Sequence, residues 1–135
     1  MTNEGTLPIG AIGWVDLTVS EGDSLRDFYS DVVGWKPEPI TMGDYSDYQM
    51  LSPETGTAVA GVCHARGTNA AIPPQWLMYI HVSDVDASAS CAEELGGAIV
   101  DGPRDMGAGR FCVIKDPAGA ICALWNPGVE EHPKD

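Results

Sequence analysis

The stretch IGWVDLTV, from Ile12 to Val19, decides the fold because a similar stretch, WLMYIHVS, returns from Trp76 to Ser83. Each stretch is followed by a segment of helical periodicity that ends at glycine. Gly34 ends the first segment and corresponds to Gly97 in the second, which is 63 positions further along the chain. A repeat on this scale indicates one domain built from two similar halves.

Composition limits the kind of protein that this chain can be. With 135 residues and 44% hydrophobic residues, it has the size and apolar content of one globular domain. Its net charge of −13 argues against a nucleic-acid-binding role, which needs a basic surface. The acidic charge has two interpretations: a solvated surface, or attraction of a cationic ligand.

Cellular location and thiol chemistry are also indicated by the sequence. No apolar run reaches the ~18 residues that a membrane span needs, and the start MTNEGTLPIG does not have the pattern of a secretory signal. We therefore expect a cytoplasmic protein. Its four cysteines form no C-x-x-C pair, so buried free thiols are expected rather than disulfides or zinc ligands.

Alternation of apolar residues predicts strands, and helical spacing predicts helices. The first half is expected as a strand at 11–20, a helix at 21–33 and strands at 36–41, 45–51 and 57–64. The second half is expected as a strand at 76–83, a helix at 85–95 and strands at 98–101, 111–115 and 120–125. Residues 65–75, rich in proline and glycine, are expected to be a linker, and 127–135 a loose tail.

Each half therefore has the order βαβββ, which predicts an α+β fold. One module covers about 11–64 and the other about 76–126. A four-stranded sheet with one helix has one covered face and one bare face. Two bare faces curled toward each other would form a cleft for a small ligand.

Several motifs in this order resemble the vicinal oxygen chelate superfamily, whose members include glyoxalases, bleomycin-resistance proteins and dioxygenases. They are Trp14-Val15-Asp16-Leu17, Phe28-Tyr29 followed by Gly34-Trp35, Val85-Asp86-Ala87 leading to Glu94-Leu95-Gly96-Gly97, and Gly109-Arg110-Phe111 followed by Asp116-Pro117-Ala118-Gly119. The resemblance covers nearly the whole chain and implies the two-module cleft. It does not specify a reaction, because the superfamily includes isomerases, epimerases, ring-cleaving dioxygenases and drug-sequestering proteins.

Metal-dependent members that this chain resembles place one His, Glu or Gln ligand on each of four strands. The corresponding positions here are Trp14, Ala60 or neighbouring Gly61, Leu77 and Ala123. None of these side chains coordinates a divalent ion. We therefore expect neither a metal nor another cofactor.

Alternation places an apolar and aromatic set of side chains on the cleft face. It includes Trp14, Asp16 and Thr18, then Ala58, Ala60, Val62 and His64, then Leu77, Tyr79 and His81, and finally Ile121, Ala123 and Trp125. We predict ligand-binding roles for Trp14, Tyr48, His64, Tyr79 and Trp125, with Tyr48 at the rim. For His64 and Tyr79, a half-exposed strand end and simple packing are the respective alternatives.

Asp16 and His81 are the candidate catalytic residues, because an aspartate that orients a histidine makes a general base near neutral pH. Alternatively, Asp16 binds a backbone amide and His81 contacts the other half or a second subunit. The favoured function is a metal-independent binder of an aromatic or cationic small molecule. The alternative is a lyase or isomerase that uses Asp16 and His81. In either case a homodimer is expected, since family members commonly pair.

Overall fold

The computed structural model describes residues 7–128. Its elements, in chain order, are β1 (Ile12–Val19), α1 (Gly22–Val33), β2 (Lys36–Thr41), β3 (Ser46–Leu51), β4 (Ala58–His64), the 3₁₀ turn η1 (Gly67–Asn69), β5 (Trp76–His81), α2 (Val85–Glu94), β6 (Ala98–Met106), β7 (Gly109–Lys115) and β8 (Ile121–Pro127). They separate into two compact units. Unit A is Trp14–Met78, and unit B comprises Gly13, the described residues before it and those from Tyr79 onward.

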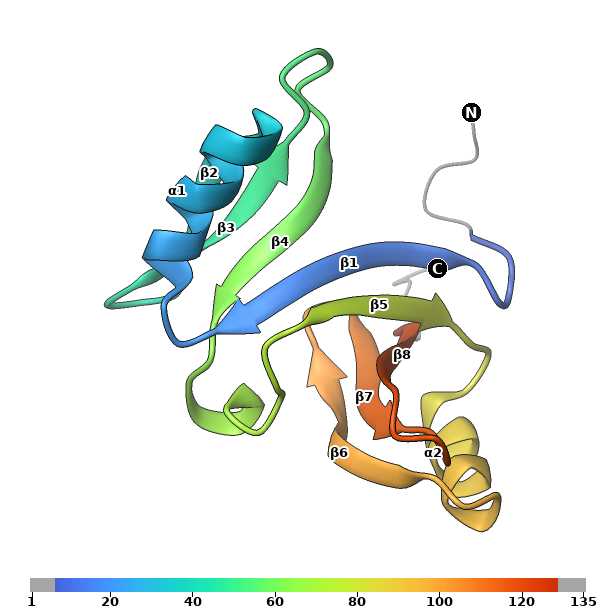
Figure 1. The fold of residues 1–135 in the computed structure, drawn as a ribbon. Helices are drawn as coiled ribbons and strands as arrows, with labels where there is room; N and C mark the ends of the chain where they lie inside the picture. Colours follow the sequence, from blue (N-terminus) through green and yellow to red (C-terminus); the bar gives the residue numbers. More distant parts are fainter. Residues whose placement is uncertain (1–6, 129–135) are drawn as a thin grey trace. The chain divides into compact units, whose positions relative to one another are not determined.

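In unit A the strands lie in the order β2-β3-β4-β1, with β1 parallel to β4 and the other neighbours antiparallel. Helix α1 packs against β2 and β4 (Figure 1). It turns Leu25 and Tyr29, which are one helical turn apart, toward a core that includes Met50 and Val62. The helix ends where Gly34 adopts a left-handed φ of 88° and donates its N–H to the Ser30 carbonyl.

Unit B has the matching strand order β5-β8-β7-β6, with β5 parallel to β8. Helix α2 packs against β6, β7 and β8 and closes a core of Val85, Ala89, Cys112 and Leu124. Asp84 caps this helix by accepting a hydrogen bond from the Ala87 N–H at 3.2 Å. The parallel pair in each unit joins the first and last strands of one repeat, which is the arrangement that the sequence repeat implies.

The predicted α+β fold with two βαβββ modules is confirmed. Two local expectations are corrected. Strand β6 extends to Met106 instead of ending at Asp101, because it continues past Pro103 through a shift in its register with β7. The segment expected as a linker contains η1 and the buried Ile72, which is 6% exposed. Most of the expected tail, residues 129–135, lies outside the described residues.

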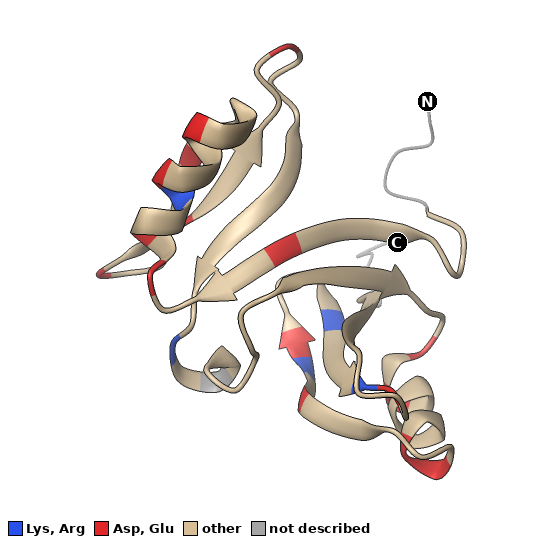
Figure 2. Cartoon of the chain, in the orientation of Figure 1, with Lys and Arg blue, Asp and Glu red and all other residues tan. Residues whose placement is uncertain are grey.

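Acidic residues gather on the surface of α1, as Figure 2 shows. Asp23, Asp27 and Asp31 recur every four residues and therefore share one side of the helix. Arg26 offsets part of this charge through its Nε, which lies 2.9 Å from Asp27 Oδ1. Neither helix of residues 7–128 has the length and apolar composition that crossing a bilayer requires.

Candidate functional site

The sheet of unit B turns one row of side chains away from α2, and we call this row the aromatic face. It consists of Tyr79, His81, Phe111, Ala123 and Trp125. Strand register pairs Tyr79 with Ala123 and His81 with Trp125, and it also pairs Phe111 with Trp125. Directly opposed residues share a face, and the α2 core occupies the other one. Alternation in the sequence places Tyr79, His81 and Trp125 on this same side, and their binding roles remain predictions.

Ring side chains meet in two pairs on the aromatic face. Tyr79 and Phe111 stack with ring centroids 6.4 Å apart and planes inclined by 27°. The rings of His81 and Trp125 lie 5.7 Å apart at 47°. Phe111 is 2% exposed, whereas Tyr79, His81 and Trp125 are half-buried. These three rings therefore keep accessible surface on which a flat ligand can stack.

An arginine that the sequence prediction did not include also lies on this face. The Arg104 guanidinium sits 4.4 Å above the centre of the Phe111 ring. Two hydrogen bonds to Asp101, at 3.2 and 2.9 Å, fix its orientation. The side chain keeps 33% exposure, so it can donate to an oxygen of a bound molecule. The expectation that β6 ends at Asp101 hid this residue, because Arg104 then fell in a loop.

His81 is held by backbone contacts from the chain before β1. Its Nδ1 lies 3.3 Å from the Pro8 carbonyl oxygen. Its N–H donates to Ala11 O at 2.8 Å, and its carbonyl accepts from the Gly10 N–H at 2.7 Å. When Nδ1 carries the proton and donates to Pro8, Nε2 has the lone pair that a general base needs.

In unit A, the face opposite α1 carries Trp14, Asp16 and Thr18. Asp16 pairs with Gly61 in the β1–β4 ladder. A Cβ at Gly61 would lie 3.0 Å from Asp16 Cβ and 3.5 Å from the Trp14 ring, so glycine allows both side chains to cover β4. Asp16 is 8% exposed and Thr18 is 5% exposed. Asp16 belongs to unit A and His81 to unit B, and their pairing remains a prediction.

The expected placement of Val62 and His64 on the cleft face is wrong. Leu17 pairs with Val62 and Val19 with His64, so both β4 residues lie on the face that α1 covers. The β4 sequence is apolar at both parities, and alternation therefore could not choose the face. Tyr48 pairs with Val62 and lies in the same core rather than at a rim.

His64 and Tyr48 instead belong to a polar cluster at the start of α1. The two nitrogens of the His64 ring lie 3.3 Å from Asp47 Oδ1 and 3.5 Å from Asp23 Oδ1. The Tyr48 hydroxyl donates to Asp23 at 2.8 Å and accepts from Arg26 at 2.7 Å. Burial, followed by the hydrogen bond to Asp23, raises the pKa of Tyr48 above its ordinary value. The cluster fastens α1 to β3 and β4.

The positions corresponding to the family's metal ligands carry no donor side chain. Register resolves the choice on β4: Gly61 pairs with Asp16, as Ala123 pairs with the equivalent Tyr79. The four positions are therefore Trp14, Gly61, Leu77 and Ala123. Among residues 7–128, no group of three or more His, Cys, Asp or Glu side chains is arranged to hold a metal ion. The residues present do not fit a divalent metal at this place in the fold.

Cys63 of unit A and Cys112 of unit B do not have the environment of an activated nucleophile. Burial, with smaller contributions from Asp16 and Asp47, raises the pKa of Cys63 well above its ordinary value. Burial also raises the pKa of Cys112 to about 11. Nucleophilic cysteines need a lowered pKa, so neither thiol has the environment of a catalytic residue.

The chain is a member of a known superfamily. The sequence model of the Glyoxalase/Bleomycin resistance protein/Dioxygenase superfamily matches residues 11–123, and the chain belongs to this family. Similar curated proteins include CFP32 of Mycobacterium tuberculosis, which carries a glyoxylase name, at 35% identity over 123 residues. The anthracycline biosynthesis protein DnrV of Streptomyces peucetius is 30% identical over 134 residues. Each match covers 90% of this chain but only 46% and 49% of the respective relative, so the chain spans about half of their length.

Solved structures show the same fold at low sequence identity. A methylmalonyl-CoA epimerase in complex with methylmalonyl-CoA superposes with a TM-score of 0.56 at 16% identity, covering 92% of this chain and 99% of its own. A Mn(II)-bound glyoxalase from Novosphingobium aromaticivorans gives 0.54 at 19% identity, over 91% of this chain and 42% of its own. At these identities the likeness concerns the fold, and the function has to be argued from this chain's own residues.

Proposed function

We propose that this protein binds a small aromatic or cationic molecule without a metal ion, as a binding protein of the glyoxalase/bleomycin-resistance type. The aromatic face carries the proposal. There the half-buried rings of Tyr79, His81 and Trp125 surround Ala123, where a metal-dependent relative would place a ligand. A small side chain at that position leaves a flat ring surface in place of a metal donor.

Arg104 adds an orienting group to this surface. Its guanidinium stays in one place because Asp101, with a side chain that is 8% exposed, holds it through two hydrogen bonds. A carbonyl or phenol oxygen on the ligand's ring system would accept a hydrogen bond from its free N–H groups. This favours an aromatic compound with oxygen substituents over an unsubstituted hydrocarbon.

The charge of the chain and the name of one relative both favour an anthracycline as the probe for this surface. A net charge of −13 attracts cations, and DnrV is named for anthracycline biosynthesis. An anthracycline combines fused planar rings, quinone and phenol oxygens, and an amino sugar. The rings would stack on the aromatic face, the oxygens would meet Arg104, and the ammonium group would respond to the overall charge.

The test is a titration of the protein with an anthracycline, with binding measured by isothermal titration calorimetry. We expect saturable binding in the parent and ~3- to 10-fold weaker binding in Trp125→Leu, the range that loss of one aromatic contact gives. Trp125→Phe, which keeps a ring, should restore most of the affinity. Phe28→Leu is the matched control, since Phe28 is an exposed ring on α1 in unit A. Equal affinity in all four proteins would refute the placement on the aromatic face.

The aglycone of the same anthracycline separates stacking from charge. It keeps the rings and oxygens but lacks the amino sugar. If the acidic charge contributes, the aglycone should bind more weakly than the anthracycline at low salt, and the two affinities should become equal at high salt. Equal binding at low salt would limit recognition to the rings and their oxygens.

One observation favours the alternative of an enzyme, a lyase or isomerase with Asp16 and His81 as acid-base residues. The contact between Nδ1 of His81 and the Pro8 carbonyl selects the tautomer with a basic Nε2. An enzyme of this kind should lose its turnover in both His81→Ala and Asp16→Asn while far-UV circular dichroism stays unchanged. Full turnover in either variant would exclude the role of that residue.

We also propose that the chain is one domain with halves at about 11–64 and 76–126. Two copies of this chain would form a cytoplasmic homodimer. Light scattering after size-exclusion chromatography tests the pairing. A mass near twice the 14.3 kDa of the chain supports it, and a mass near 14.3 kDa rejects it.

A further inference from the structure

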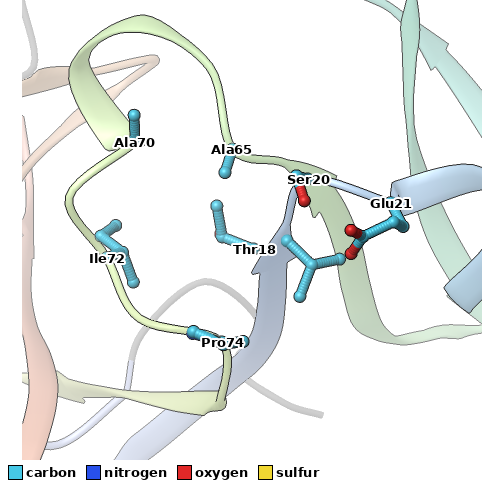
Figure 3. A pocket seen from close by; sticks show the side chains of 8 residues that line it. Thr18, Ser20, Glu21, Ala65, Ala70, Ile72 and Pro74 are labelled. Atoms are coloured by element: carbon cyan, nitrogen blue, oxygen red, sulfur yellow. The ribbon is translucent and has the colours of Figure 1, made fainter.

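Unit A contains a pocket that the function proposed above does not use. It lies where β1 ends and α1 begins, and the segment after β4 closes its other side (Figure 3). Its volume is about 360 Å³, at the lower end of the range for ligand sites. Its walls include the polar side chains of Thr18, Ser20 and Glu21 and the apolar side chains of Ala70, Ile72 and Pro74.

The outer wall of the pocket is a folded segment. The N–H of Ala65 donates to the Val19 carbonyl at 2.8 Å, and the N–H of Ile72 donates to the Asn69 carbonyl at 3.2 Å. The Asn69 side chain also accepts from the Arg66 N–H at 2.6 Å and donates to the His64 carbonyl at 3.2 Å. These bonds hold the wall in place, so a ligand would not have to order it on binding.

Glu21 is the only charged residue among those that line the pocket. It precedes α1, and among the described residues its side chain makes no capping hydrogen bond to that helix. Figure 3 shows its carboxylate and the Ser20 hydroxyl at one end of the ring of lining side chains. Arg66 follows the lining residue Ala65 in the chain but is not itself a lining residue. Its guanidinium lies 4.0 Å from the centre of the Tyr45 ring.

We propose that this pocket binds a small organic ammonium ion. Its charged group would pair with Glu21 and donate to the Ser20 hydroxyl, and its apolar body would lie against Ile72 and Pro74. The volume equals that of on the order of a dozen water molecules at ~30 Å³ each, which is room for a small ring or a short hydrocarbon chain. A carboxylate or phosphate of the same size would meet the Glu21 charge, and no Lys or Arg is among the lining residues to offset the repulsion.

The ligand class follows from this distribution of groups. An ammonium ion has three donors and no acceptor, and the polar end of the pocket supplies the Glu21 carboxylate and the Ser20 hydroxyl. Apart from Thr18, the remaining lining residues are apolar, which favours a hydrocarbon chain or ring over a sugar or a peptide. The site lies wholly within unit A and is independent of the aromatic face in unit B.

The test uses three probes of one shape: 2-phenylethylammonium, neutral 2-phenylethanol and anionic phenylacetate. Binding to the full chain is followed by ¹H–¹⁵N correlation NMR. We expect the ammonium ion to bind with a Kd of ~0.1–10 mM, as suits a ligand of this size, and to shift the amide signals of Glu21, Ala65 and Ile72. Affinity should be at least ~3-fold lower for the alcohol, and phenylacetate should not saturate these signals.

Two variants locate the binding. Glu21→Gln removes the charge and should weaken the ammonium ion ~3- to 10-fold. Ala70→Phe fills the pocket and should abolish the shifts for both the ammonium ion and the alcohol. Glu38→Gln is the matched control, because it removes the same charge from exposed strand β2 and should leave the Kd unchanged.

Three results would overturn the proposal. They are equal binding of the ammonium ion and the alcohol, equal losses in Glu21→Gln and Glu38→Gln, and saturable shifts that persist in Ala70→Phe with an unchanged fold. A loss of anthracycline affinity in Trp125→Leu would not support this pocket as an ammonium site, since that measurement concerns unit B only. The two proposals therefore succeed or fail separately.

Discussion

Replacing Tyr48 with phenylalanine tests how α1 is fastened to its sheet. The change removes one hydroxyl from a side chain that is 9% exposed and leaves the ring in the core. Two hydrogen bonds disappear, the donation to Asp23 at 2.8 Å and the acceptance from Arg26 at 2.7 Å. Both partners are charged groups, which makes each bond stronger than a neutral one.

The expected cost follows from the exposure of the partners. Hydrogen bonds to charged groups contribute about 1.5–3 kcal/mol each when they are well shielded. The side chains of Arg26 and Asp23 are 27% and 67% exposed, so water replaces much of what they lose. We therefore expect a total loss of about 1–2 kcal/mol in the free energy of unfolding. For a domain of 135 residues this corresponds to a fall in Tm of about 3–7 °C.

The assay is urea unfolding followed by circular dichroism, together with a thermal scan. Tyr45→Phe is the matched control, because the Tyr45 ring contacts His64 and Arg66 while no hydrogen bond of its hydroxyl occurs in the described part of the chain. It should change stability by less than about 0.5 kcal/mol. Equal effects of the two substitutions would refute the reasoning.

The pH dependence supplies a second check. The pKa of Tyr48 is raised in the folded state, so the folded protein holds this proton more tightly than the unfolded chain. The resulting stability is fully present below the unfolded value of about 10 and is lost as pH rises through the folded value. The stability difference between the parent and Tyr48→Phe should therefore be constant from pH 6 to 9 and shrink above about pH 10. A difference that grows above pH 10 would contradict this.

Two further predictions concern a thiol and a glycine. With Ellman's reagent at pH 8, exposed Cys91 should react first, whereas Cys112 should react only on unfolding, because burial raises its pKa to about 11. Peptide mass spectrometry that finds Cys112 labelled as fast as Cys91 would contradict this. Gly61→Ala should cost about 1–3 kcal/mol in thermal unfolding, because its Cβ would lie 3.0 Å from Asp16 Cβ; an unchanged Tm would show that β4 has room to shift.

Much of the fold could be predicted because the repeat and the alternation carry independent information. Strand β5 is the clearest example, since polar and apolar residues alternate around Tyr79 and His81 and fix which face they take. The parallel pairing of β1 with β4, and of β5 with β8, was not predicted, because alternation gives the face of a side chain and not the partner of its strand. Local spacing was sufficient wherever the two faces of a strand differ in polarity.

The candidate site was harder to predict where that difference is missing. Strand β4 reads AVAGVCH, with small or apolar residues at both parities, and only its register with β1 shows that His64 faces α1. The role of residues 65–75 as a pocket wall depends on hydrogen bonds to Val19 and Asn69, which local composition does not encode. Arg104 was not predicted as a site residue because β6 continues through a proline and a shifted register.

The central claim is that this member of the superfamily binds its ligand without a metal ion. The most direct measurement is elemental analysis of protein purified without a histidine tag or chelators, combined with anthracycline calorimetry before and after dialysis against EDTA. We predict less than one tenth of an equivalent of any transition metal, together with the same Kd in both titrations. A stoichiometric metal whose removal abolishes binding would contradict it.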